Sequence, residues 1–112
     1  MPGSKGEGQN TLLSSLGLCA RAGTLIFGTP MVCEAMRQGG KKQPKLVLEA
    51  ADTSENTHKK LTDKCTYYGV RHIRLANTGG ELAAALGKSA TLAAVAVCDE
   101  NMCRMLEKHW NS

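Results

Sequence analysis

The seven residues from Leu92 to Cys98, LAAVAVC, constrain the fold of this chain more than any other segment. Polar and apolar residues do not alternate in this run, which is typical of a strand covered on both faces. The run is also far too short to cross a bilayer, which takes roughly 20 apolar residues. A strand with two covered faces needs a layer of other elements on each side, so the rest of the chain has to supply those layers.

Strand-like and helical segments alternate along the rest of the chain. Further strands are predicted at 25–27, 45–50 and 70–75. Apolar residues at helical spacing predict helices that start at the capping residues Asn10 or Thr11, Thr29, Asp52 to Ser54, Thr78 and Asp99. This alternation predicts an α/β protein that folds as a three-layer α/β/α sandwich.

The length and composition indicate one domain preceded by a tail. The chain has 112 residues, 42% of them apolar and 21% charged, which suits one globular domain of about 100–150 residues. Residues 1–9 contain three glycines and no apolar residue after Met1, so we expect a flexible tail there and the domain over 10–110. Since no apolar signal region begins the chain, we expect a cytoplasmic protein.

The cysteines have the pattern of reduced thiols in a core. Their number is odd, no two form a C-x-x-C pair, and most lie in periodic apolar segments. They are Cys19, Cys33, Cys65, Cys98 and Cys103. Because a thiol nucleophile needs an exposed, electropositive setting, a small thiol enzyme is kept only as an alternative.

The histidines and glycines do not form a recognisable metal or phosphate motif. His58, His72 and His109 fall on three predicted elements and have no paired spacing to any cysteine. His58 is expected at the edge of the core on the helix after residue 54. Neither a G-x-G-x-x-G nor a G-x-x-x-x-G-K-[ST] sequence is present. We therefore expect no metal, no cofactor and no catalysis.

Positive charge is concentrated in the middle of the chain. The sequence has 14 Lys and Arg against 10 Asp and Glu. From Arg37 to Arg74 there are nine basic and four acidic residues. Such a local excess favours a polyanionic partner such as nucleic acid, although a solubilising surface explains it equally well.

One helix start has the features of an anion-binding site. Gly28, Thr29 and Pro30 lead into the second predicted helix, with Thr29 as its expected cap. The first N–H groups of a helix lack helical partners, and Gly28 allows a phosphate to approach closely. Capping alone explains many such starts, so both interpretations stay open. The far end of the same helix is basic, with Arg37, Lys41 and Lys42.

Several phrases of the sequence together resemble a known family. They are LGLCARAG at 16–23, the Gly-led helix start at 28, KLVLEAADTSENTHKKLTDKCTYY at 45–68 and ELAAALGK at 81–88. Over about residues 11–108 the chain resembles the kink-turn-binding ribosomal protein superfamily, and within it the small bacterial YlxQ-like branch. The resemblance implies a sandwich around a mixed four-stranded sheet, in agreement with the alternation above.

The resemblance also implies RNA binding without catalysis. In that family the start of the second helix enters a groove widened by sheared G·A pairs, and a neighbouring loop covers an extruded base, which is recognition through shape and splayed bases. By position, Gly28 and Thr29 match that helix start, 51–53 match the base-covering loop, and 87–88 match a second contact loop. The predicted RNA-binding residues are Gly28, Thr29, Pro30, Met31, Arg37, Lys41, Lys42, Ala51, Asp52, Thr53, Gly87 and Lys88.

The expected partner is thus structured RNA, and ribosomal RNA and the ribosome are among the candidates. We expect the protein to be a monomer and not to bind a membrane. The chain departs from strong kink-turn binders at three positions, since Pro30, Met31 and Glu34 stand where those proteins carry Asn, Glu and Lys. The side chains that hydrogen-bond guanine edges and contact phosphate are therefore missing, which leaves shape and backbone contact. The alternative is a protein-interaction module of the same fold without kink-turn affinity.

Overall fold

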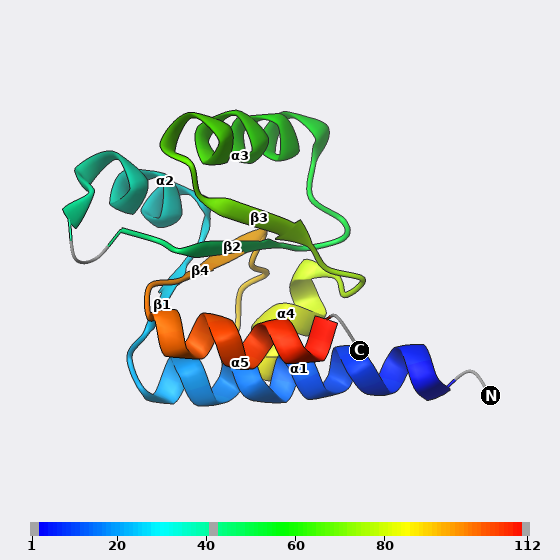
Figure 1. The fold of residues 1–112 in the computed structure, drawn as a ribbon. Coiled ribbons are helices and arrows are strands. Elements are labelled where there is room, and N and C mark those ends of the chain that lie inside the picture. Colours follow the sequence, from blue (N-terminus) through cyan, green and yellow to red (C-terminus); the bar gives the residue numbers. More distant parts are fainter. Residues whose placement is uncertain (1–2, 41–42, 111–112) are drawn as a thin grey trace.

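The structure, a computed structural model, describes residues 3–40 and 43–110, with side chains over 12–40 and 43–108. Within these ranges helices and strands alternate as predicted (Figure 1). In chain order they are α1 (Gly3–Arg21), β1 (Leu25–Phe27), α2 (Thr29–Gln38), β2 (Leu46–Glu49), α3 (Glu55–Tyr68), β3 (Arg71–Arg74), α4 (Gly79–Ala85), β4 (Ala94–Val97) and α5 (Glu100–Trp110). None of the helices in the described ranges has the length and apolarity needed to span a membrane.

The strands form one mixed, four-stranded sheet in the order β1-β4-β2-β3. Strand β4 runs antiparallel to β1 and β2, whereas β2 and β3 are parallel. Every residue of β4 and of its neighbour β2 is buried. The prediction that the 92–98 run forms a strand covered on both faces is confirmed, although β4 itself is shorter than the run.

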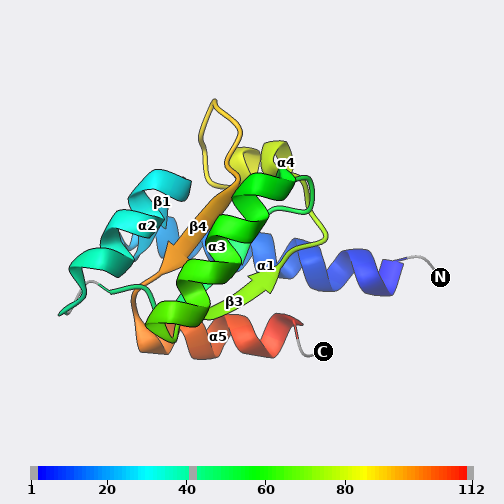
Figure 2. The same cartoon turned by 90° about the horizontal axis from the view of Figure 1, so that it is seen from above.

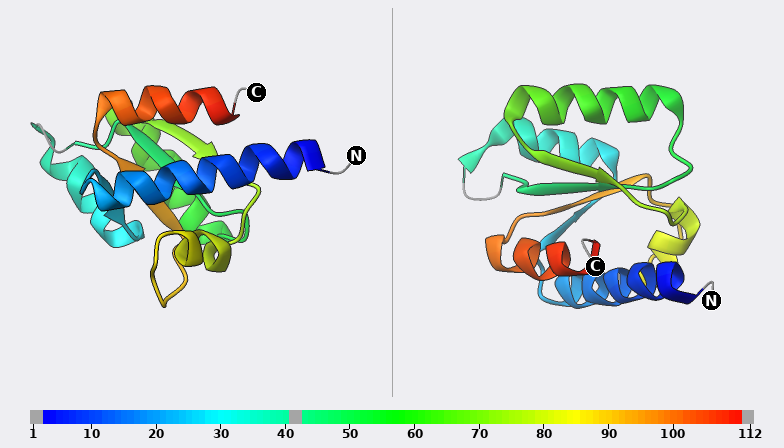
Figure 3. Two further views of the ribbon diagram at one scale, coloured as in Figure 1. Left: turned by 90° about the horizontal axis from the view of Figure 1, so that it is seen from below. Right: turned by 45° about the vertical axis from the view of Figure 1, so that its right-hand side comes forward.

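Helices cover both faces of this sheet. Figures 1 and 3 show α1, α4 and α5 on one face and α2 and α3 on the other. The chain therefore folds as the predicted α/β/α sandwich.

The core is divided in two because successive strand residues point to opposite faces. Leu46 and Leu48 of β2 pack among residues of α1, α4 and α5. Val47, which lies between them, packs among residues of α2 and α3. The next position on that second face is Glu49, a fully buried carboxylate. This one charged residue interrupts an otherwise apolar strand.

The predicted start signals of three helices are confirmed. Ser54 caps α3 through its side-chain oxygen. Thr78 and Glu81 form the capping box of α4. At α5, Asp99 Oδ1 accepts a hydrogen bond of 2.9 Å from the backbone N–H of Asn101.

The predicted cap of α2 was wrong. Gly28, not Thr29, occupies the N-cap position, with φ 86° and ψ 146°, and Thr29 is the first helical residue. That backbone conformation is open almost only to glycine. It makes the turn from β1 into α2 within one residue, so Thr29 is drawn into the helix. Its buried Oγ1 has no hydrogen-bond partner among the described residues.

Helix α1 begins earlier than the sequence predicted. The expected start was Asn10 or Thr11 after a tail over 1–9, whereas α1 begins at Gly3. Extending an existing helix by one turn costs much less free energy than nucleating a new helix, so the helix that forms after Thr11 can extend toward the N-terminus. Amino-acid composition alone does not predict this extension. The mobility of residues 3–9 stays a prediction.

Candidate functional site

Three of the predicted contact segments meet at one edge of the sheet. The backbone N–H of Gly28 donates to the carbonyl of Ala94 over 2.9 Å, and that of Ala50 donates to Ala93 over 2.8 Å. Since β4 is antiparallel to both neighbours, its start lies between the end of β1 and the end of β2. Figure 2 shows the starts of α2 and α3 and the loop between α4 and β4 at this same end of the molecule.

The loop over 51–53 is fixed from several sides. The backbone N–H of Ala51 donates to the carbonyl of Asn77 over 2.8 Å, and Thr53 Oγ1 donates to Ala50 over 2.6 Å. Asp52 Oδ1 accepts a hydrogen bond of 2.8 Å from the backbone N–H of Gly79, the first residue of α4. The loop is thus held in one conformation, and Asp52 acts as a tether as well as an exposed charge.

The loop between α4 and β4 is fastened by a close approach at Gly79. A Cβ on that residue would lie 2.6 Å from Thr91 Cγ2 and 2.7 Å from the Leu92 carbonyl oxygen. Leu92 also donates its N–H to the Gly79 carbonyl over 3.2 Å. Only a glycine permits this contact, which holds the end of the α4–β4 loop against the start of α4. The beginning of the same loop is fixed by the N–H of Lys88, which donates to the carbonyl of Ala83 over 2.8 Å.

The first turn of α2 is exposed to solvent. Pro30 and Met31 are both exposed, Met31 with 60% of its surface accessible. Pro30 has no N–H, so by helix geometry Thr29 and Met31 supply the N–H groups that the first turn directs outward. This turn combines a helix dipole with an apolar side chain and carries no charged group.

The basic end of α2 is separate from this edge. Helix α2 has 10 residues, about 15 Å of rise, and Arg37 lies in its last turn. Arg37 donates to Glu34 through Nε (3.1 Å) and Nη2 (2.5 Å). Hydrogen bonds from Arg37 and then Gln38 hold the pKa of Glu34 below its usual value. The Arg37 charge is therefore largely balanced, and Lys41 and Lys42 lie outside the described residues.

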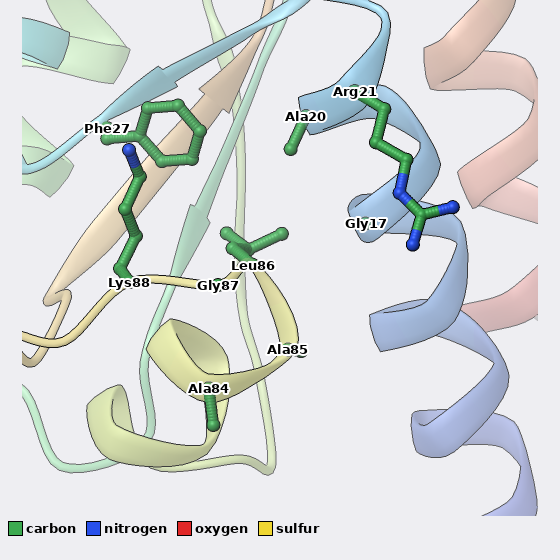
Figure 4. A pocket seen from close by; sticks show the side chains of 9 residues that line it. All are labelled: Gly17, Ala20, Arg21, Phe27, Ala84, Ala85, Leu86, Gly87 and Lys88. Atoms are coloured by element: carbon green, nitrogen blue, oxygen red, sulfur yellow. The ribbon is translucent and has the colours of Figure 1, made fainter.

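A pocket of about 410 Å³ adjoins the Gly87–Lys88 loop, between α1 and α4 (Figure 4). Lys88 Nζ lies 4.3 Å from the centre of the Phe27 ring, a cation–π distance. The opposite wall comes from α1 and includes Gly17 and Arg21. Sequence reasoning did not place Phe27 or Arg21 beside the 87–88 loop, because contacts between separate elements are not visible in the sequence.

Four of the five thiols are poor nucleophiles. Burial raises the pKa of Cys65 and of Cys103 to about 11. Burial also raises the pKa of Cys19 and of Cys98. All five cysteines are free, and none of these four is a thiolate at neutral pH. The structure gives no support to the thiol-enzyme alternative.

The expectation that the histidines do not cluster was wrong for two of them. His58 Nδ1 lies 2.8 Å from Glu49 Oε2, and His72 Nε2 lies 2.7 Å from Glu49 Oε1. The residues come from α3, β2 and β3, so their distance along the chain hid the contact. The one available signal was a glutamate inside the apolar strand KLVLEA.

The chain is similar to several known proteins. A family model described as the ribosomal protein L7Ae/L30e/S12e/Gadd45 family matches residues 10–107. RNA-binding protein YlxQ of Bacillus subtilis is 37% identical over 91 residues, which is 81% of this chain and 86% of that protein. RNA-binding protein YlxQ of Enterococcus faecium is 41% identical over 58 residues, 52% of this chain and 53% of that protein.

Two solved structures have the same fold. A protein of unknown function from Bacillus halodurans superposes with a TM-score of 0.80 at 34% identity, covering 90% of this chain and 97% of that one. The Giardia lamblia 15.5kD RNA binding protein gives a TM-score of 0.73 at 17% identity, covering 94% and 86%, a likeness of fold. From these matches, this chain belongs to the ribosomal protein L7Ae/L30e/S12e/Gadd45 family, in which its predicted resemblance to the YlxQ-like branch is confirmed.

Proposed function

We propose that this protein is a noncatalytic RNA-binding module that contacts structured, kink-turn-like RNA through one edge of its sheet. The contact surface consists of the α2 start (28–31), the loop at 51–53 and the loop at 87–88. The observation that carries the proposal is the pair of hydrogen bonds from Gly28 and Ala50 to the start of β4, which place the α2 start and the 51–53 loop side by side. The Lys88 ammonium over the Phe27 ring adds the 87–88 loop to them. The curated relatives named RNA-binding protein YlxQ support RNA as the partner.

The chemistry of this edge suits a sugar–phosphate backbone. The α2 start offers N–H groups at the positive end of a helix dipole, and Gly28 has no side chain to hold a phosphate away. Lys88 adds a cation at the neighbouring loop, where Phe27 already holds its ammonium group. Because the edge is preformed, RNA binding does not have to order it, which favours recognition by shape.

In the proposed mechanism, this edge of the protein recognises the base sequence of the RNA only weakly. Pro30 offers no hydrogen-bonding side-chain group to guanine edges, and Met31 offers only a weak thioether acceptor. Glu34 is negative and is committed to Arg37. Affinity then depends on backbone contacts at the edge, with Lys41 and Lys42, which follow α2 in the sequence, adding charge for a longer RNA. Arg37 contributes once RNA phosphates compete with Glu34 for it.

The proposed setting is the cytoplasm, with ribosomal RNA or the ribosome as the source of the RNA and a monomer as the binding species. The five free cysteines support a reducing compartment, because thiols persist there. No step of the proposal needs a cofactor.

A protein-interaction module is the second candidate. The observation that favours it is Met31, which is 60% exposed in the contact surface, while Arg37 at the other end of α2 is ion-paired. An exposed methionine is typical of adaptable protein interfaces.

Salt dependence separates the two candidates. A labelled hairpin RNA that contains an internal bend is titrated with the protein at several salt concentrations. RNA binding predicts that log K falls with log salt by about 0.7 to 0.9 per neutralised phosphate. No measurable RNA binding at low salt would contradict the proposal and favour the protein-interaction module.

A further inference from the structure

Glu49 is a carboxylate buried where the sheet is otherwise apolar. It is fully buried at the end of β2, on the face that packs against α3. Burying an unpaired charge costs several kcal/mol, so a buried carboxylate needs close positive or hydrogen-bonding partners. The fold supplies two imidazoles. His58 approaches from α3 and His72 from the neighbouring β3, on the same face of the sheet.

The three side chains converge on one point. His58 Nδ1, His72 Nε2 and a Glu49 oxygen all lie within 4.8 Å of one another. Two imidazoles with one carboxylate form a ligand set that proteins use for Zn²⁺ and related divalent transition metals. We propose that Glu49, His58 and His72 bind a divalent transition-metal ion of this class.

The distances from the two imidazoles to Glu49 require only a small adjustment, whereas the two ring nitrogens, up to 4.8 Å apart, have to approach each other. Ligand atoms that surround Zn²⁺ tetrahedrally at about 2.0–2.1 Å are roughly 3.3 Å apart. The nitrogen-to-oxygen contacts to Glu49 are 2.7–2.9 Å, the length of hydrogen bonds, so each opens by roughly half an ångström when the ion enters. The His58 side chain is 39% exposed, so its ring can shift and the ion can enter from its side.

The surrounding charges permit a cation. The nearest one is Arg74, whose Nε lies 3.6 Å from Glu49 Oε2, beyond hydrogen-bond length. Its Nη2 donates instead to the carbonyl of Ala51 over 3.2 Å, and the side chain is about half exposed. Arg74 therefore makes no hydrogen bond to the Glu49 oxygens, which the two histidines contact, and its side chain can move out into solvent when an ion binds.

The ion would fasten the base of the 51–53 loop. Glu49 precedes that loop at the end of β2, and His58 follows it in the first part of α3. A bound ion joins both ends of the loop and adds β3 through His72. None of the three ligands belongs to the proposed RNA-contact surface, so the metal site stands or falls separately from the proposed function.

The test uses the full chain, stripped with a chelator and kept reduced. Zn²⁺ is titrated by calorimetry, and Co²⁺ is added as a spectroscopic probe. We expect one ion per chain, a higher melting temperature with Zn²⁺, and the intense visible bands of Co²⁺ with four or five ligands. Absence of stoichiometric binding by the wild-type chain would overturn the proposal.

The variants separate ligation from hydrogen bonding. His58→Asn with His72→Gln keeps an amide N–H near each imidazole nitrogen, so the bonds to Glu49 survive while the ligand lone pairs are lost. Zn²⁺ should then bind more than about 100-fold more weakly, since changes in groups that only orient ligands already cost about 10- to 100-fold. Unchanged affinity in this double variant would overturn the assignment.

Two controls identify the ligands directly. His109→Gln removes the remaining histidine, and Cys33→Ser with Cys98→Ser removes the two half-buried thiols; both should bind Zn²⁺ as the wild type does. Loss of binding in either control would assign the ion to other residues. Should the double histidine variant fail to fold, Co²⁺-induced paramagnetic shifts in the wild type decide, because His58 and His72 must show the largest imidazole shifts.

Discussion

Asp52 Oδ1 accepts the backbone N–H of Gly79 across 2.8 Å and thereby ties the loop after β2 to the first residue of α4. The two residues are 27 positions apart in the sequence. This hydrogen bond ties the 51–53 loop, one segment of the proposed RNA-contact surface, to the helix that precedes another, the 87–88 loop, and its effect on stability can be measured.

Asp52→Ala should lower the free energy of unfolding by about 1.5 kcal/mol, because the partly buried N–H of Gly79 loses a charged acceptor. Asp52→Asn keeps an Oδ1 acceptor and should cost about half as much. Urea denaturation with equal m-values measures both. Equal losses for the two variants would mean that the Asp52 charge, and not the hydrogen bond, provides the stability.

Gly79→Ala should destabilise the fold by about 1–3 kcal/mol, because the added Cβ would overlap Thr91 Cγ2 and the Leu92 carbonyl oxygen. Gly80→Ala is the matched control. A Cβ on Gly80 would have Thr78 Oγ1, at 3.9 Å, as its nearest neighbour, and a helical alanine should gain up to about 1 kcal/mol. Thermal melts of the pair check this, and a stable Gly79→Ala protein would refute the close packing of the α4–β4 loop.

Stability should fall between about pH 9 and pH 11. Burial raises the pKa of Cys65 and Cys103 from 9.0 to about 11. Between these values the unfolded chain has released thiol protons that the folded chain still holds, so the free energy of unfolding decreases as pH rises. Subtracting the profile of a Cys65→Ala, Cys103→Ala variant removes the contribution of lysines and tyrosines. A flat difference between the two profiles would argue against buried thiols.

Restoring the residues of strong kink-turn binders should tighten binding to kink-turn RNA. The triple variant Pro30→Asn, Met31→Glu, Glu34→Lys supplies side-chain groups for guanine edges and phosphate, and it frees Arg37 from its ion pair. We expect at least about tenfold higher affinity for the kink-turn, about 1.4 kcal/mol. Glu34→Lys alone is the control and should improve binding to bent and straight RNA alike. A triple variant no better than this control would place the contact elsewhere.

Local signals predicted the elements well. The strand at 25–27 coincides with β1, and the capping box at Thr78 and Glu81 sets the start of α4. These features depend on neighbouring residues, which the sequence displays directly. The strand β4, which is covered on both faces, could also be predicted, because a short apolar run without alternation is typical of such a strand.

Contacts between residues far apart in the sequence could not be predicted from the sequence alone. The cluster of Glu49, His58 and His72 depends on the parallel pairing of β2 with β3, which sets Val47 opposite His72 and Glu49 opposite Arg74. No spacing rule relates residues whose proximity is set by strand register. The cap of α2 was missed for another reason: Thr29 has a capping side chain, but the one-residue turn demanded the backbone freedom of Gly28.

The most direct test of the proposed contact surface compares two RNAs of the same length. A labelled kink-turn RNA and a matched straight duplex are titrated with the wild-type protein at roughly physiological salt. We predict that the kink-turn binds at least about tenfold more tightly, a difference of about 1.4 kcal/mol, because the preformed edge recognises shape and backbone. Equal affinity for the two RNAs, or no binding to either, would contradict that account.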